Sequence, residues 1–257
     1  MGLIACRVNA QQNDSLFITR PATIDGPEIS IDDALKKMSD RRQRIKSLMV
    51  PAALVTYGFV SLGNERLKDL NQKIKEEVWS DHPHQLWHAD NFLEWAPAIS
   101  VYALNAAGIH GKNNFRDRTI IYLLSDVMTR VFVSSLKKIT HQLRPDGSDY
   151  ASFPSGHAAH AFVSAEFLRQ EYKNVSPWYG IAGYAMAVTT AYLRIYNNKH
   201  YLGDVLAGAG FGMASTKISY WLYPKIKKWL FKDRQVHTMV LPVYQDKSFG
   251  LMLVHHF

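Results

Sequence analysis

The sequence is poor in cysteine, in charged residues and in repeated or low-complexity segments. Its 257 residues include one cysteine, Cys6, which excludes an internal disulfide. Charged residues make up 20% of the chain and hydrophobic residues 47%, a balance that excludes a disordered protein. The net charge is +8, but no basic block carries interleaved aromatic residues, so we expect no nucleic-acid partner. The positive charge fits an anionic lipid or a phosphorylated substrate better.

The N-terminus lacks the long apolar core of an ordinary signal peptide, yet it carries two marks of export. Residues 3–6 (LIAC) resemble a lipoprotein signal box, and residues 8–10 (VNA) resemble a signal-peptidase site. Only a few apolar residues precede either site. We therefore expect an export signal whose beginning is missing from this chain, with an ordinary cytosolic start as the alternative.

Apolar segments of helical length follow residue 44 and predict an all-α fold, a bundle of about six core helices. The first segment is about long enough to cross a bilayer, and the last is rich in Gly, Ala and Ser, which permit close helix packing. An amphipathic helix is expected at 65–79. The six apolar segments are 45–63, 91–109, 118–138, 155–172, 177–195 and 204–223.

The surroundings of these segments favour a membrane-embedded bundle. The basic clusters RRQR (41–44) and KIKKWLFKDR (225–234) flank apolar segments, as anchors at a membrane surface do. Asp126 and Arg130 lie four residues apart, so we expect them to pair inside the bundle, because lipid would not tolerate them. The mean hydropathy of −0.17 is low for a polytopic protein, and a soluble bundle of very apolar helices is the alternative.

The two ends of the chain differ from the bundle, which predicts three parts. An export-like and polar segment covers 1–44, and the helical bundle covers 45–224. A basic linker and a tail follow at 225–257. Two β-prone runs on either side of residues 245–248 predict that the tail is a short C-terminal β-hairpin.

The first chemically informative stretch is KKITHQLRP. Lys137 and Arg144 are seven residues apart, so on one helix they would project from the same face, and Pro145 would end that helix. A lysine and an arginine near a helix end can clamp an oxyanion, the arginine through a bidentate fork. Basic residues at helix ends also interact with the helix dipole or with lipid, so this stretch alone is weakly specific.

The second stretch is ASFPSGHAAHAF, in which Pro154, Ser155, Gly156 and His157 precede an apolar run. Serine is a favoured N-cap residue, so the pattern predicts a helix that begins here with a histidine in its first turn. The first N–H groups of a helix and its dipole favour a bound phosphate. An ordinary cap with an incidental histidine is the alternative.

The third stretch is LRIYNNKHYLGD, which contains Arg194, His200 and Asp204. The four-residue spacing of His200 and Asp204 would place both on one helix face. A carboxylate that binds one imidazole nitrogen fixes the tautomer and makes the other nitrogen a better nucleophile. Taken alone, such a pair is more often structural than catalytic.

Together, the three stretches resemble the three-part signature of the type-2 phosphatidic acid phosphatase superfamily. The patterns K-x6-R-P, P-S-G-H and R-x5-H-x3-D occur in the family's order, with its gaps, over residues 137–204. The family includes lipid phosphatases, bacterial acid phosphatases and vanadium haloperoxidases. Leu193 stands where the family usually has serine, which removes one expected hydrogen bond to phosphate.

The resemblance implies a role for each matching residue. His200 would attack phosphorus and form a phosphohistidine, Asp204 would orient His200, and His157 would protonate the leaving oxygen. The implied chemistry needs no metal and no other cofactor. The implied phosphate-binding residues are Lys137, Arg144, Ser155, Gly156 and Arg194.

The leading functional hypothesis is a phosphatase in the bacterial inner membrane whose active site faces the periplasm. Its substrate would be a phosphorylated lipid. The candidates are a lipid of the lipid A type, undecaprenyl diphosphate and phosphatidylglycerol phosphate. Substrate choice is expected to depend on segment 64–92 and on the helix connections. A soluble periplasmic acid phosphatase, a vanadate-dependent haloperoxidase and a silent lipid-binding relative are the alternatives. The oligomeric state stays open.

Overall fold

The computed structural model describes residues 31–81, 84–230, 238–245 and 248–255. The chain divides into two units, Met1–Gln43 and Arg44–Phe257. The expected export signal lies outside the described residues. The helices that build the candidate site all belong to the second unit.

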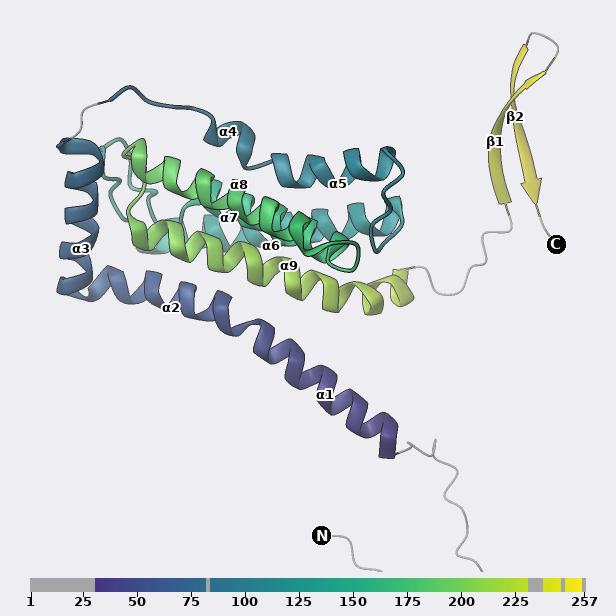
Figure 1. Cartoon of the computed structure of the whole chain (residues 1–257), viewed down its shortest axis with the longest axis horizontal. Helices are drawn as coiled ribbons and strands as arrows, with labels where there is room; N and C mark the ends of the chain where they lie inside the picture. The colour runs from purple at the N-terminus through teal and green to yellow at the C-terminus, as the bar shows by residue number, and fades with distance from the viewer. Residues whose placement is uncertain (1–30, 82–83, 231–237, 246–247, 256–257) are drawn as a thin grey trace, which may run out of the picture. The chain divides into compact units, whose positions relative to one another are not determined.

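The predicted all-α bundle is confirmed, and each of the six apolar segments contains helix (Figure 1). Segment 91–109 is broken into two helices, because the chain bends at Trp95 just before Pro97 opens the second one. The amphipathic helix after the first apolar segment is also present and ends in a π turn at Glu76–Ser80. The helices are α1 Ile31–Ser47, α2 Met49–Gly63, α3 Glu65–Lys75, α4 Asp90–Leu93, α5 Ala96–Ala106, α6 Phe115–Thr140, α7 Gly156–Tyr172, α8 Pro177–Tyr196 and α9 Leu202–Leu230.

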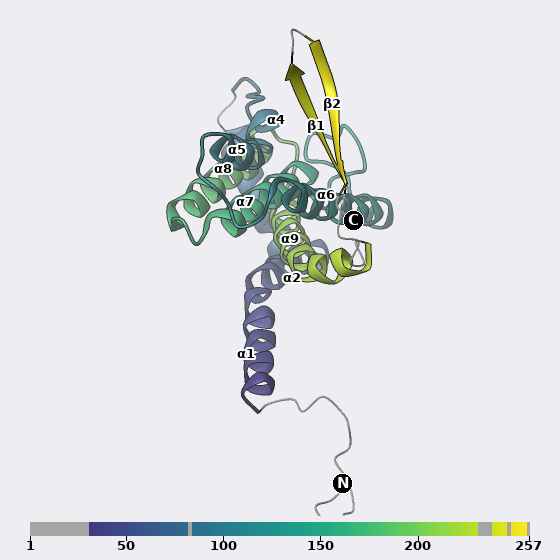
Figure 2. The same cartoon turned by 90° about the vertical axis from the view of Figure 1, so that its right-hand side faces the viewer.

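Helix α7 lies at the centre of the bundle and packs against α5, α6, α8 and α9. Figure 2 shows it between α5 and α8 on one side and α6 on the other. Glycines on α9 allow a close approach to α7, as the small-residue pattern predicted. A Cβ atom on Gly212 would lie 2.2 Å from the Ala159 carbonyl oxygen, and one on Gly208 would lie 2.4 Å from that of Ser155. The two backbones are therefore nearly in contact.

Several charged side chains of the bundle form ion pairs. The fully buried Glu166 of α7 lies 2.6 Å from Arg169 of the same helix and 2.6 Å from Lys217 of α9. On α6, Asp126 pairs with Arg130 at 2.7 Å, as predicted, and reaches His160 of α7 at 2.9 Å. The expected interior position is wrong for Arg130, whose side chain is 53% exposed. Pairing of this kind offsets the cost of removing charges from water.

The predicted C-terminal hairpin is present. Strands β1, Thr238–Gln245, and β2, Ser248–His255, pair antiparallel with Gln245 opposite Ser248. Helix α9 contains Pro224 and continues to Leu230, so the first residues of the expected linker are helical.

Candidate active site

The three motif stretches meet at one end of the bundle, where α6 and α8 end and α7 and α9 begin. Two backbone hydrogen bonds join the stretches. The Ser152 N–H donates to the Gln142 carbonyl at 3.0 Å, and the Ser155 N–H donates to the Asp204 carbonyl at 3.0 Å. Residues separated by up to about 70 positions in the sequence are thus brought into one small region.

The start of α7 agrees with the sequence prediction. Ser155 is the N-cap, has an extended backbone and accepts a hydrogen bond from the Ala158 N–H at 3.5 Å. Gly156 and His157 are the first two helical residues, and their N–H groups lie where a helix has no intrahelical acceptor. Ser155 is buried, whereas the His157 side chain is 32% exposed. This helix start can accept an anion.

The predicted helical spacing of Lys137 and Arg144 is wrong. Helix α6 ends at Thr140, five residues before Pro145, because His141 adopts a left-handed conformation with φ of 46°. The His141 N–H closes the last turn onto the Lys137 carbonyl at 3.2 Å. Lys137 therefore lies in the last turn of the helix, and Arg144 lies in the loop that follows. The fold, and not a shared helix face, brings them together.

Lys137 and Arg144 each contact an oxygen atom of the protein. Lys137 Nζ donates to the Ala151 carbonyl at 2.8 Å. Arg144 Nε lies 2.9 Å from Asp149 Oδ1, and the Asp149 side chain is 48% exposed. Lys137 also lies within electrostatic range of Arg144 and of Arg194, so three positive charges converge here.

Arg194, at the end of α8, is almost buried. Its Nη1 lies 2.5 Å from Oδ2 of Asp90, and Asp90 is completely buried. Arg194 Nε is buried and finds no hydrogen-bond partner among the described residues. One edge of the guanidinium is therefore fixed by a carboxylate, and another donor remains for a ligand.

His200 precedes α9, which begins at Leu202, so the prediction that His200 and Asp204 share a helix face is wrong. The two side chains are nevertheless close, with His200 Nδ1 3.6 Å from Asp204 Oδ2. The same oxygen accepts hydrogen bonds from Ser152 Oγ at 2.5 Å and from the Tyr201 N–H at 3.0 Å. The carboxylate is thus held firmly beside the imidazole.

His200 is buried among positive charges, and this decides its protonation. Burial, together with the charges of Arg194 and Lys137, lowers the pKa of His200 to about 4 against the opposing influence of Asp204. The imidazole is therefore neutral at neutral pH. A neutral imidazole beside a carboxylate is a competent nucleophile.

Sequence reasoning missed four residues that reach this site. Ser152 binds the Asp204 carboxylate, and Asp90 binds Arg194. Asn91 Oδ1 lies 2.9 Å from His157 Nε2, and Glu94 Oε1 lies 3.9 Å from the same nitrogen. The last three residues look, in the sequence, like an ordinary polar start to the second apolar segment. Burial raises the pKa of Glu94 to about 7.

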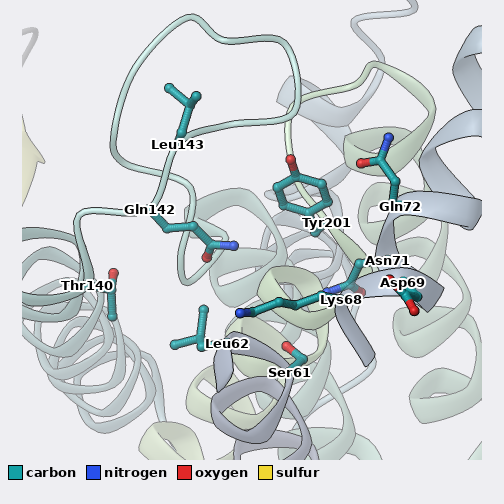
Figure 3. Close-up of a pocket in the computed structure, with 10 residues that line it drawn as sticks. All are labelled: Ser61, Leu62, Lys68, Asp69, Asn71, Gln72, Thr140, Gln142, Leu143 and Tyr201. Carbon is teal, nitrogen blue, oxygen red and sulfur yellow. The ribbon is translucent and has the colours of Figure 1, made fainter. Parts of the chain in front are cut away.

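A cavity of about 560 Å³ lies beside the motif residues, between α3 and the loop after α6. Lys68 and Gln142 extend into it, and the Tyr201 ring forms part of its wall (Figure 3). Tyr201 directly follows His200 in the chain, and Gln142 lies two residues before Arg144. The lining residues are Ser61, Leu62, Lys68, Asp69, Asn71, Gln72, Thr140, Gln142, Leu143 and Tyr201.

Comparison with known proteins agrees with the resemblance in the motifs. The model of the PAP2 superfamily matches residues 118–228, which contain all three motif stretches. A lipid A 1-phosphatase of Porphyromonas gingivalis is 31% identical over 166 residues, which are 64% of this chain and 36% of that protein. The chain thus spans just over a third of the length of the curated relative that it matches.

Solved structures with this fold include a transmembrane PAP2-type phosphatidylglycerolphosphate phosphatase from Bacillus subtilis. It is 23% identical, with a TM-score of 0.51, and the match covers 70% of this chain and 98% of that one. The LpxE protein of Aquifex aeolicus is 24% identical, with a TM-score of 0.45 over 59% of this chain and 95% of its own. The B. subtilis structure shares the helical fold described above.

Proposed function

Because the chain carries a PAP2 superfamily domain, we propose that it is a phosphatase that hydrolyses a lipid phosphate ester through a phosphohistidine. One observation carries this proposal. A neutral, buried histidine lies beside a fixed carboxylate and within electrostatic range of Lys137 and Arg194, close to a helix N-terminus. Phosphoryl transfer depends mainly on positioning and on stabilisation of negative charge, and this arrangement supplies both.

The phosphate is proposed to lie at the start of α7. The Gly156 N–H and the Ser155 hydroxyl donate to its oxygens, and Ser155 can do so while its oxygen caps the helix. Arg194 donates through its unpartnered Nε, and Lys137 and Arg144 exchange their present acceptors for phosphate oxygens. Charge-assisted bonds of this type are about twice as strong as neutral ones.

The reaction takes two steps. His200 attacks phosphorus through the nitrogen that faces away from Asp204, the phosphorus–oxygen ester bond breaks, and His157 gives a proton to the leaving oxygen. Asp204 stabilises the positive charge that develops on His200. Water then attacks the phosphohistidine, His157 takes a proton from that water, and inorganic phosphate and free His200 are released. The scheme uses no metal ion.

An exposed apolar surface supports a membrane location. Stretches Leu35–Gly63 and Phe115–Thr140 are long and apolar enough to cross a bilayer, and few of their residues are buried in the protein. Along α6, Leu123, Val127 and Val131 lie four residues apart, and each is more than half exposed. A surface of this kind is unfavourable in water and favourable in lipid. We propose that the bundle lies in the inner membrane with its catalytic end toward the periplasm.

The cavity beside the site supports a substrate with a polar headgroup. Its volume of about 560 Å³ lies within the range of small-molecule sites. Amide, ammonium and hydroxyl groups from Gln72, Gln142, Lys68 and Tyr201 line it, and such groups bind sugar or glycerol hydroxyls. A glycosyl or glycerol phosphate of the lipid A or phosphatidylglycerol phosphate type therefore fits better than undecaprenyl diphosphate. The name of the P. gingivalis relative points toward lipid A.

Phosphate release from a substrate panel tests the proposal. Detergent-purified wild type and His200→Ala would be given lipid A, phosphatidylglycerol phosphate, undecaprenyl diphosphate and a small aryl phosphate. We expect release from a polar-headgroup lipid, no release by the variant, and a phosphorylated wild-type intermediate on rapid quench. Activity on the aryl phosphate alone would indicate a broad acid phosphatase. Release that survives His200→Ala would contradict the mechanism.

The headgroup cavity has its own test. Gln142→Ala should raise KM for the preferred lipid several-fold and leave the kinetics on the aryl phosphate unchanged, because the aryl phosphate has no headgroup to occupy the cavity. An equal effect on both substrates would mean that Gln142 supports the neighbouring Arg144 and not the substrate.

A further inference from the structure

We infer that the short helix α4 forms part of the catalytic site, where Asp90 and Asn91 are positioning residues for Arg194 and His157. The inference rests on the proposed function, since it assigns supporting roles around the same phosphate. Helix α4 precedes the segment 118–228 that matches the superfamily and carries none of the three motifs.

The contact between Asp90 and Arg194 fixes the plane of a phosphate-binding guanidinium. Asp90 is completely buried and reaches Arg194 Nη1 at 2.5 Å. The guanidinium is rigid and planar, so holding one nitrogen fixes the direction of the others. By charge alone, a carboxylate here would weaken the binding of a phosphate. Its contribution is therefore orientation, because it aims the unpartnered Nε at the ligand.

Arg144 offers an informative contrast. Its partner is Asp149, an aspartate beside an arginine just as Asp90 is beside Arg194. The Asp149 side chain, however, is 48% exposed and lies in a loop. Phosphate can displace an exposed carboxylate into water, whereas it cannot displace Asp90, which has no route to solvent in the folded protein. The same substitution, aspartate to asparagine, should thus have opposite effects at the two positions.

Asn91 has a matching role for His157. Its side-chain carbonyl accepts a hydrogen bond from Nε2 at 2.9 Å, so the neutral ring carries its proton on that nitrogen. The His157 side chain is partly exposed, and without this contact the ring could rotate into solvent. A general acid must be held within hydrogen-bond reach of the leaving oxygen. Because the Nε2 proton is shared with Asn91, the proton for the leaving oxygen comes from Nδ1 of the doubly protonated ring, and the Asn91 carbonyl stabilises that cation.

The segment before α4 is pinned to the end of α8, which makes α4 a firm support. The Trp87 N–H donates to Asn197 Oδ1 at 2.9 Å, and Asn197 Nδ2 donates to the Trp87 carbonyl at 2.8 Å. Asn197 is the residue that follows α8, three positions after Arg194. Helix α4 packs against α8 and runs above it in Figure 1. Asp90 and Arg194 are therefore held on two elements that cannot move apart freely.

Phosphate inhibition tests the role of Asp90, with Asp149→Asn as the matched control. The readout is the inhibition constant of inorganic phosphate against hydrolysis of an aryl phosphate, together with kcat and KM. We expect Asp90→Asn to weaken phosphate binding at least tenfold, and Asp149→Asn to leave it unchanged or tighten it. Removing a negative charge would by itself tighten binding in both variants. Phosphate binding to Asp90→Asn that equals or exceeds that of wild type would overturn the inference.

Two further measurements keep this test decisive. If Asp90→Asn does not fold, Asp90→Glu takes its place, because it retains the ion pair but displaces the guanidinium. The same loss of phosphate binding is expected. An inhibition constant for phosphate in Asp90→Glu equal to that of wild type would refute the role. If wild type hydrolyses no phosphate ester, the proposed function fails. The rise in melting temperature with added inorganic phosphate then compares wild type with Asp90→Asn directly.

Leaving-group dependence tests the role of Asn91. An alkyl phosphate has a poor leaving group and needs the general acid more than an aryl phosphate does. We expect Asn91→Ala to slow hydrolysis of the lipid substrate at least tenfold more than that of the aryl phosphate. Asn91→Asp keeps an acceptor for His157 and should restore much of the difference. Equal losses on both substrates would show that Asn91 does not act through His157.

Discussion

Replacing Asp204 by asparagine should lower kcat by roughly 10³-fold and leave KM nearly unchanged. The amide oxygen of the variant will stay where Oδ2 is now, because Ser152 Oγ and the Tyr201 N–H still require an acceptor there. The substitution therefore removes the negative charge beside His200 and keeps the position of the neighbouring oxygen. Asp204 makes no contact with the proposed phosphate, so substrate binding should be little affected.

The magnitude follows from the distance between the two groups. His200 becomes positive when it attacks phosphorus, and its Nδ1 lies 3.6 Å from Asp204 Oδ2. Unit charges at that distance interact by about 4.6 kcal/mol at an effective dielectric constant of roughly 20. Each 1.36 kcal/mol in the barrier is about tenfold in rate, which gives a loss of roughly 10³-fold in kcat.

Single-turnover phosphate release with rapid quench is the assay, since it separates formation of the phosphohistidine from product release. Ser152→Ala is the matched control: it removes one hydrogen bond from the same carboxylate and keeps the charge, so a loss of about tenfold or less is expected. An Asp204→Asn variant with kcat within tenfold of wild type would refute the charge argument. A raised KM at unchanged kcat would assign Asp204 to substrate binding instead.

Three further predictions concern other parts of the fold. Burial raises the pKa of Glu94 to about 7. Glu94→Gln should therefore match wild type in kcat/KM at acid pH, where Glu94 is neutral, and differ from it above pH 7, where only wild type carries the charge. Parallel pH profiles of kcat/KM would contradict this. Gly212→Ala places a Cβ against the Ala159 carbonyl and should cost about 1–3 kcal/mol of unfolding free energy, visible as a lower melting temperature. Lys217→Met leaves the buried Glu166 with one cation fewer and should lower the free energy of unfolding by about 3 kcal/mol. An unchanged melting temperature would show that Arg169 alone is enough to pair with Glu166.

Local sequence patterns predicted the helices well because each pattern reports a local cause. Ser155 could be assigned as an N-cap because serine before an apolar run satisfies the first N–H groups of a helix. The glycines of α9 indicated close packing because they remove the Cβ atoms that would keep two backbones apart. The residue types in the three motifs likewise indicated phosphate chemistry before any geometry was available.

The geometry between the motifs could not be predicted in the same way. A seven-residue interval looks helical, but the left-handed conformation of His141 ends α6 first, and histidine is not a usual residue at that position. Asp90 meets Arg194 across 104 residues of chain, and no periodicity records such a contact. Ser152 was missed because a serine in a loop carries no signal for the carboxylate that it binds.

The folded protein itself offsets the repulsion among the cations of the candidate site. Three positive charges held close together in buried and half-buried positions repel one another, and the repulsion must be offset within the protein. Asp149 and Asp90 supply negative charge to Arg144 and Arg194, and a backbone carbonyl satisfies Lys137. Because Asp149 is exposed and Asp90 is buried, we expect the proposed phosphate to replace Asp149 and to bind alongside Asp90. The candidate site would then be fixed on its buried side and exchangeable on its exposed side, so the proposed phosphate could bind without rearrangement of the helices.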